Sequence, residues 1–102
     1  MRIEVVGEDT SSSQQARAYA EYRVFAALAR HTRHIRRVRV VLRRDARTEP
    51  HGTVVCVVMV ALEPSGTVRT RAQAQHVYGA INRAIDRIGD LMRREVLQRL
   101  SS

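Results

Sequence analysis

The chain has 102 residues, of which 44% are hydrophobic, and its 18 basic and 10 acidic side chains give a formal net charge of +8. This length suits one domain with a single core, and the apolar content is too high for a wholly disordered chain. A single cysteine, Cys56, excludes an internal disulfide framework, and the longest apolar run, Val54 to Leu62, is far shorter than the roughly 20 residues needed to span a membrane. Because Met1 to Gly7 lacks the apolar core of a signal peptide, we expect a cytoplasmic protein with no membrane contact.

The first third of the chain predicts a strand followed by a helix. Arg2 to Val6 alternates polar and aliphatic residues before Gly7, as a strand does. A helix is expected to start at Ser11 and Ser12, because each has a glutamine three positions later, the capping-box spacing. Its apolar positions are expected at Ala18, Tyr22, Phe25 and Ala29, with Tyr19 and Ala26 beside them, and it should end near His31 to Arg33.

The segment Ile35 to Arg44 predicts a strand with two different faces. Val38, Val40 and Leu42 alternate with Arg37, Arg39 and Arg43, so one face is aliphatic and the other basic. The loop Asp45 to Gly52, with Pro50, follows it.

The second half predicts two more strands and a long helix. Thr53 to Leu62 is apolar almost throughout, which is typical of a central strand. After a turn at Glu63 to Gly66, Val68, Thr70 and Ala72 alternate with Thr67, Arg69 and Arg71. A helix then extends from about Gln73 to Leu100, weakened by Gly79 and Gly89.

The order of these elements predicts an α+β fold, β-α-β-β-β-α, with a four-stranded mixed sheet and both helices packed on one face. A right-handed crossover makes the first two strands parallel, and short turns make the others antiparallel. Aliphatic residues must lie under the helices, because a one-residue shift in register would bury the arginines. The open face should therefore carry Arg37, Arg39, Arg43, Arg69 and Arg71.

The basic charge is concentrated in the sequence. Residues 30–47 contain eight arginines and one acid, Asp45, a local charge of +7. Such a concentration of charge attracts polyanions, and an arginine guanidinium group can donate two parallel hydrogen bonds to phosphate oxygens. A solvated basic loop is the alternative interpretation.

The kind of nucleic acid is limited by the aromatic residues. Proteins that bind single-stranded nucleic acid on a β-sheet present aromatic side chains there, on which the bases stack. In this chain the aromatic residues are all expected on helices, packed against the core or the sheet: Tyr19, Tyr22, Phe25 and Tyr78. Phosphate contact with folded RNA fits better. The last helix offers Arg83, Arg87, Arg93 and Arg94, but Asp90 is placed to pair with Arg87 and Arg94, so a solvated, salt-bridged helix is an equal alternative.

Catalysis and metal binding are not indicated. His31, His34, His51 and His76 are scattered, without the spacing of a helical zinc motif, and no glycine-rich phosphate loop is present. Cys56 alternates with valines and is expected to be a small core residue. We expect no enzyme activity and no cofactor.

Several short motifs, in order, resemble the ribosome hibernation-promoting factor and ribosome-associated inhibitor family. They are Gly7, the Arg-x-Tyr of Arg17 and Tyr19, basic Arg23, the strand Val38-x-Val40-Val41-Leu42, the run Tyr78-Gly79-Ala80-Ile81-Asn82, Asp86-Arg87-Ile88 and Arg93-Arg94. The departures are His76 and Asn82 in place of aspartate, Asp90 near an expected basic position, and Val96 and Leu97 in a stretch that is usually lysine-rich.

The resemblance implies a single domain, residues 1–102, that binds the decoding region of the small ribosomal subunit and its ribosomal RNA, and that inhibits translation or stabilises idle ribosomes under stress. The dimerisation domain of the family's long form would be absent. By position, Arg23, Arg87, Arg93 and Arg94 correspond to the family's helical RNA contacts. The full candidate RNA-binding set is Arg23, Arg30, Arg37, Arg39, Arg43, Arg69, Arg71, Arg83, Arg87, Arg93 and Arg94.

Two other functions remain open. Val41, Val55, Val57 and Met59 share the open face and form a possible apolar stripe, which suits a protein-interaction module or a weak homodimer. The α-β-β-β-α order is also shared by general double-stranded RNA-binding domains.

Overall fold

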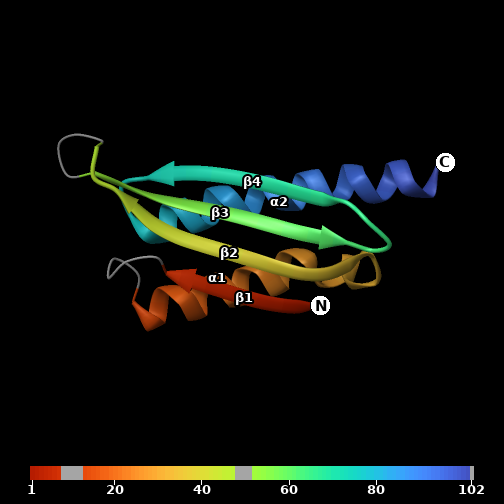
Figure 1. Ribbon diagram of the computed structural model, residues 1–102, viewed down its shortest axis with the longest axis horizontal. Helices are drawn as coiled ribbons and strands as arrows, with labels where there is room; N and C mark the ends of the chain where they lie inside the picture. Colours follow the sequence, from red (N-terminus) through yellow and green to blue (C-terminus); the bar gives the residue numbers. More distant parts are fainter. Residues whose placement is uncertain (8–12, 48–51, 102) are drawn as a thin grey trace.

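The computed structural model describes residues 1–7, 13–47 and 52–101, and its elements follow the predicted order (Figure 1). They are β1 (Arg2–Gly7), α1 (Gln14–Leu28), a 3₁₀ helix η1 (Ala29–His34), β2 (Ile35–Asp45), β3 (Thr53–Leu62), β4 (Thr67–Ala74) and α2 (Val77–Leu100). The helix start expected at Ser11 and Ser12, and Pro50 and His51 of the predicted loop, lie outside the described residues.

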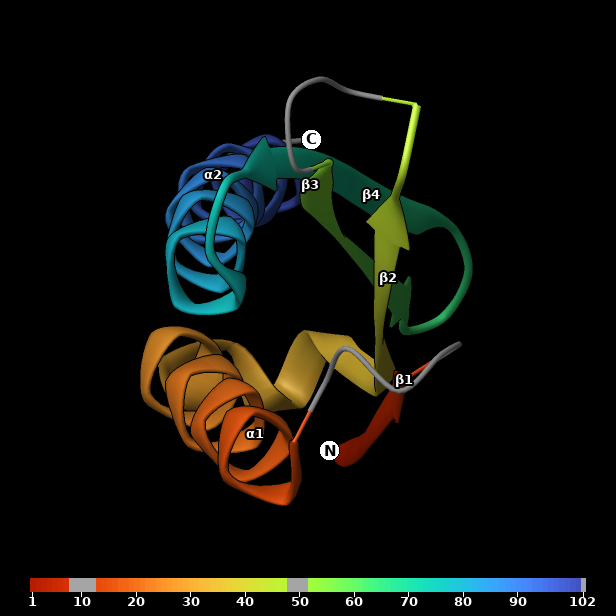
Figure 2. The ribbon, with the colours of Figure 1, turned by 90° about the vertical axis from the view of Figure 1, so that its left-hand side faces the viewer.

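The sheet has the predicted topology. Its strand order is β1-β2-β3-β4, with β1 parallel to β2 and the other pairs antiparallel. Both helices lie on one side of the sheet, and none of the described residues forms a helix on the other side (Figure 2). The predicted α+β fold class is therefore confirmed.

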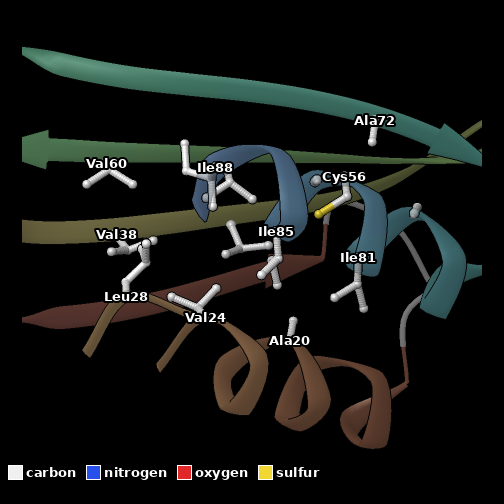
Figure 3. Close-up of a cluster of buried hydrophobic side chains, with 14 of the residues drawn as sticks. Ala20, Val24, Leu28, Val38, Cys56, Val60, Ala72, Ile81, Ile85 and Ile88 are labelled. Atoms are coloured by element: carbon white, nitrogen blue, oxygen red, sulfur yellow. The ribbon is translucent and has the colours of Figure 1, made fainter. Parts of the chain in front are cut away.

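The core lies between the sheet and the two helices. Figure 3 shows Val38, Cys56, Val60 and Ala72 of the sheet directed toward Ile81, Ile85 and Ile88 of α2 and toward Val24 and Leu28 of α1. All nine side chains have almost no exposed surface. Burial raises the pKa of the Cys56 thiol to about 12, which fits the predicted role as a core residue.

The predicted apolar face of α1 was wrong. The buried positions are Ala16, Ala20, Val24 and Leu28, one every fourth residue, whereas Tyr22 and Phe25 are 67% and 58% exposed. Two of the buried positions are alanines, and the large rings of Tyr22 and Phe25 lie on the opposite, outer side. Tyr19 is half-buried, and its ring packs edge-on against the ring of Tyr78 with the centroids 5.0 Å apart.

Two predicted boundaries also differ. The N-cap of α1 is Ser13, whose hydroxyl accepts a hydrogen bond from the Ala16 amide at 3.1 Å. At the other boundary, β4 continues to Ala74, which pairs with Val54, so α2 begins at Val77 rather than near Gln73. The Gln73 amide donates to the Thr53 hydroxyl at 2.6 Å, a cross-strand contact that extends the ladder.

Candidate nucleic-acid interface

The five arginines predicted for the open sheet face are placed there by the strand register. Arg37, Arg39 and Arg43 alternate along β2 with buried Val38, Val40 and Leu42, and Arg69 and Arg71 occupy the same phase on β4. β3 lies between the two rows, so that Arg39, Met59 and Arg69 form one line across the sheet. The face thus has two rows of guanidinium groups with an apolar strand between them.

Most of this charge is not neutralised within the described residues. Arg39 lies 3.4 Å from the Glu4 carboxylate, but Arg37, Arg43, Arg69 and Arg71 have no ion pair or hydrogen-bonded side-chain partner in that part of the chain. A face with more arginines than acids attracts polyanions.

A further arginine of this face was missed by the sequence reasoning. Arg2 pairs in register with Arg37 across the parallel β1–β2 ladder, and both line a hollow of about 380 Å³ together with Glu4, Arg39 and Met59. The alternation in β1 could have revealed this position. Because Ile3 faces the helices, its neighbour Arg2 must face the open side of the sheet. Only the β1–β2 register, however, brings it beside Arg37.

The predicted apolar stripe is on this face, but it is not exposed. Val41, Val55 and Val57 form a small cluster with Met59, and Val55 is 0% exposed although no helix of the described residues covers this side. In register, Val55 lies between Arg43 and Gln73, so these long side chains are placed to cover it. The face therefore presents guanidinium groups rather than an apolar surface.

Arg23 of α1 has an intramolecular partner. Its side chain donates to the Asn82 amide oxygen and to the Asp86 carboxylate, each at 3.0 Å, and the Tyr19 hydroxyl donates to the same Asn82 oxygen at 2.8 Å. These bonds join α1 to α2, and the Arg23 side chain is only 27% exposed. Arg23 thus holds the two helices together.

Arg83 and Arg87 of α2 reach the free edge of the sheet. Each donates to a backbone carbonyl of β4, Arg83 to that of Gln73 at 2.9 Å and Arg87 to that of Arg71 at 2.8 Å. β4 is an edge strand, so these carbonyls have no neighbouring strand to bond. Arg83 and Arg87, which the sequence suggested as RNA contacts, therefore provide hydrogen-bond donors for the outward backbone carbonyls of β4.

The salt bridges predicted on α2 are also different. Asp90 pairs with Arg93, not with Arg87 or Arg94. Arg87 is directed to the β4 backbone, and the exposed Arg94 side chain has no ion pair or hydrogen bond within the described residues. The i,i+3 pair with Arg93 leaves Asp90 near the groove between the helices.

The remaining features of the described residues concern metal ligands, one histidine and the helices. Within residues 1–7, 13–47 and 52–101, no three His, Cys, Asp or Glu side chains come together as metal ligands. Burial, and then the positive charges of Arg30, His34 and Arg93, hold the pKa of His31 below its usual value. In the same part of the chain, neither helix has the length and apolar content needed to cross a membrane.

The comparisons with known proteins agree with this architecture. A model of the sigma 54 modulation protein / S30EA ribosomal protein family matches residues 3–98. The N-terminal domain of Thermus thermophilus Protein Y is 27% identical, with a TM-score of 0.74 over 92% of this chain and 98% of that domain. A ribosomal subunit interface protein from Coxiella burnetii shares the fold at 13% identity, with a TM-score of 0.80 over 95% and 99% of the two chains.

A search of curated proteins found no match. The family model, however, spans nearly the whole chain. The resemblance inferred from the sequence is confirmed, and the chain belongs to the sigma 54 modulation protein / S30EA ribosomal protein family.

Proposed function

We propose that the protein is a non-enzymatic, cytoplasmic ribosome-associated factor that binds the small subunit and its ribosomal RNA, and that it thereby inhibits translation or stabilises idle ribosomes under stress. The binding surface is the open sheet face, where arginines contact RNA phosphates. One observation carries this proposal: Arg37, Arg43, Arg69 and Arg71 share an uncovered face and have no ion pair or hydrogen bond with an acid among the described residues. Membership of the family and the likeness to a ribosomal subunit interface protein supply the target.

The chemistry of the face favours phosphates over bases. It contains no aromatic ring on which a base could stack, because the four aromatic residues of the chain are all on helices. Arginine, in contrast, binds phosphate oxygens with two parallel hydrogen bonds. The buried state of Val41, Val55 and Val57 gives no support to the alternative of a homodimer or protein-interaction module.

The test is co-sedimentation with isolated small subunits. We expect the variant Arg37→Glu, Arg39→Glu, Arg43→Glu to lose at least about a hundredfold in affinity, because each charge-assisted hydrogen bond contributes about 1.5–3 kcal/mol. The logarithm of the binding constant falls linearly with the logarithm of the salt concentration. The magnitude of that slope should decrease by about three in the variant if each arginine contacts one phosphate.

The matched control is the variant Arg17→Glu, Arg33→Glu, Gln14→Glu, Gln98→Glu. It changes the net charge by the same amount at exposed positions off the sheet face. If both variants bind equally weakly, the effect is one of net charge, and the sheet face is not the contact. A plain RNA duplex in the same assay tests the other alternative, because a general double-stranded RNA-binding domain would bind it as tightly as it binds the subunit.

A further inference from the structure

Two rows of side chains cross the open sheet face at the end where β1 begins, each with one residue from every strand. The strand registers align the first row as Arg2, Arg37, Ala61 and Thr67. They align the second row as Glu4, Arg39, Met59 and Arg69. Because Ala61 and Thr67 are short, the first row is low beyond its two arginines, and this part of the face is the hollow of about 380 Å³.

The two rows differ in how their charges are paired between β1 and β2. Glu4, the one acid that lines the hollow, lies opposite Arg39 and pairs with it at 3.4 Å. Arg2 lies opposite Arg37, so that two like charges face each other across the same two strands, an arrangement that destabilises a sheet. Neither Arg2 nor Arg37 has an ion pair or hydrogen-bonded side-chain partner within the described residues. Nothing in this part of the fold therefore offsets the second pair.

A bulge in β2 sets the direction of Arg37. The register of β2 with β3 shifts between Ile35 and Arg37, which makes Arg36 an extra residue of the strand. Ile35 is consequently buried in the core, although Arg37 two positions later is exposed on the open face. The Arg36 side chain donates to the Glu63 carboxylate and to the Pro64 carbonyl, each at 3.1 Å, and does not line the hollow. Bulges are common beside binding sites, where they re-aim a side chain.

We propose that this hollow binds a phosphomonoester, the terminal phosphate of a nucleotide or of an RNA end, with Arg2 and Arg37 as its two hydrogen-bond donors. At pH 7 a phosphomonoester carries about −1.5 to −2 charges and three acceptor oxygens, which match two guanidinium groups without an acid. A phosphate between the two groups replaces their repulsion by two charge-assisted contacts. An internal phosphate of RNA carries a single negative charge and matches one arginine only.

The hollow has room for more than the phosphate. Its volume lies in the range of about 300–1,000 Å³ that is usual for small-molecule sites. The short side chains of Ala61 and Thr67 leave space beside Arg37 for the sugar that carries the phosphate.

The direct test is titration of the protein with adenosine monophosphate, followed by NMR of the arginine side-chain Nε resonances. We expect the resonances of Arg2 and Arg37 to shift until they saturate. Adenosine, which has no phosphate to accept the charge-assisted hydrogen bonds, should bind at least about tenfold more weakly. If adenosine monophosphate shifts neither resonance, or if adenosine binds equally well, the phosphate site is refuted.

The most informative variant is Arg2→Glu, because stability and binding should change in opposite directions. It places a carboxylate opposite Arg37, as Glu4 lies opposite Arg39, so the melting temperature should rise by up to about 4 °C. The affinity for adenosine monophosphate should fall at least about tenfold, because one donor is replaced by an acid. Since a protein that melts no lower is folded, this loss cannot come from misfolding.

The matched control is Arg17→Glu, which makes the same change of charge at an exposed position of α1. It should bind adenosine monophosphate like the wild type. Equal weakening by Arg17→Glu would show an effect of net charge, and undiminished binding by Arg2→Glu would show that Arg2 makes no contact. Either result overturns the proposal.

Two RNA oligonucleotides of one sequence, with and without a terminal phosphate, distinguish the source of the ligand. If the phosphorylated form binds more tightly and loses this advantage in Arg2→Glu, an RNA end fits the hollow. If the two forms bind equally while adenosine monophosphate still binds, the ligand is a free nucleotide. These titrations contain no ribosomes, so the failure of co-sedimentation with small subunits would overturn the proposed function and leave the phosphate site standing.

Discussion

The contacts of Arg83 and Arg87 with β4 predict that these residues prevent self-association. Replacing both by methionine keeps much of the aliphatic stem and removes the two hydrogen bonds to the Gln73 and Arg71 carbonyls. A typical hydrogen bond contributes about 0.5–1.5 kcal/mol, so the unfolding free energy should fall by about 1–3 kcal/mol. This is less than the stability of an ordinary domain, so the variant should still fold.

The larger effect should be on the edge of the sheet. β4 is an eight-residue edge strand, and without the arginines its outward carbonyls are free to pair with a second copy. We expect light scattering to show a concentration-dependent dimer or larger species for Arg83→Met, Arg87→Met and a monomer for the wild type.

The control is Arg17→Met, Arg33→Met, which removes the same charge and adds the same apolar side chains at exposed positions away from β4. If both double variants associate, the cause is lost charge or added apolar surface rather than an open edge. A double variant of Arg83 and Arg87 that stays monomeric at every concentration would refute the reasoning.

Three other predictions concern stability and reactivity. Tyr22→Ser and Phe25→Ser should each change the unfolding free energy by no more than about 0.5 kcal/mol, whereas Val24→Ala between them should cost about 1–3 kcal/mol in chemical denaturation, because only Val24 is buried. Since the pKa of His31 is lowered in the fold, the unfolded chain binds more protons, so the unfolding free energy should decrease as the pH falls below about 6.5, and His31→Gln should flatten that profile. Cys56, with its pKa raised to about 12, should resist iodoacetamide at pH 8 in the native protein and react on unfolding, and rapid native labelling would contradict its burial.

The period-two pattern of the strands made the sheet predictable from the sequence. In β2, a one-residue shift would have buried three arginines, so the faces of Val38 and Arg37 were fixed by the cost of that shift. The same reasoning failed for α1, where alanines occur on several sides of the helix and two large rings suggested the wrong face. Ala16 and Ala20 are buried because they are small, and hydrophobicity alone does not distinguish them from Ala18 or Ala26.

The roles of the arginines were less predictable, because they depend on contacts between residues far apart in the sequence. Arg23 meets Asp86 across 63 positions, and Arg99 donates to the backbone carbonyls of Glu63 and Ser65 in the β3–β4 turn. Spacing along α2 suggested that Asp90 would pair with Arg87 or Arg94, but Arg87 is drawn to the edge of β4 instead. A backbone carbonyl without a strand partner is an acceptor that no charge pattern reveals.

The position of the acids, more than that of the arginines, determines which surface remains free to bind a polyanion. Six of the seven acids in the described residues each pair with an arginine: Glu4, Asp45, Glu63, Asp86, Asp90 and Glu95. On the open sheet face Glu4 meets Arg39, and Asp45, in the same phase at the end of β2, pairs with Arg47. The pairs of Asp86 and Asp90 lie on the helix side. The arginines of the two helices are thus largely engaged within the fold, whereas those of the sheet face keep their charge. It follows that introducing an acid in the row between the two strands, for example Met59→Glu beside Arg39 and Arg69, should weaken ribosome binding at least as much as removing either arginine, because one carboxylate offsets one positive charge and also competes with phosphate for hydrogen bonds from both neighbours.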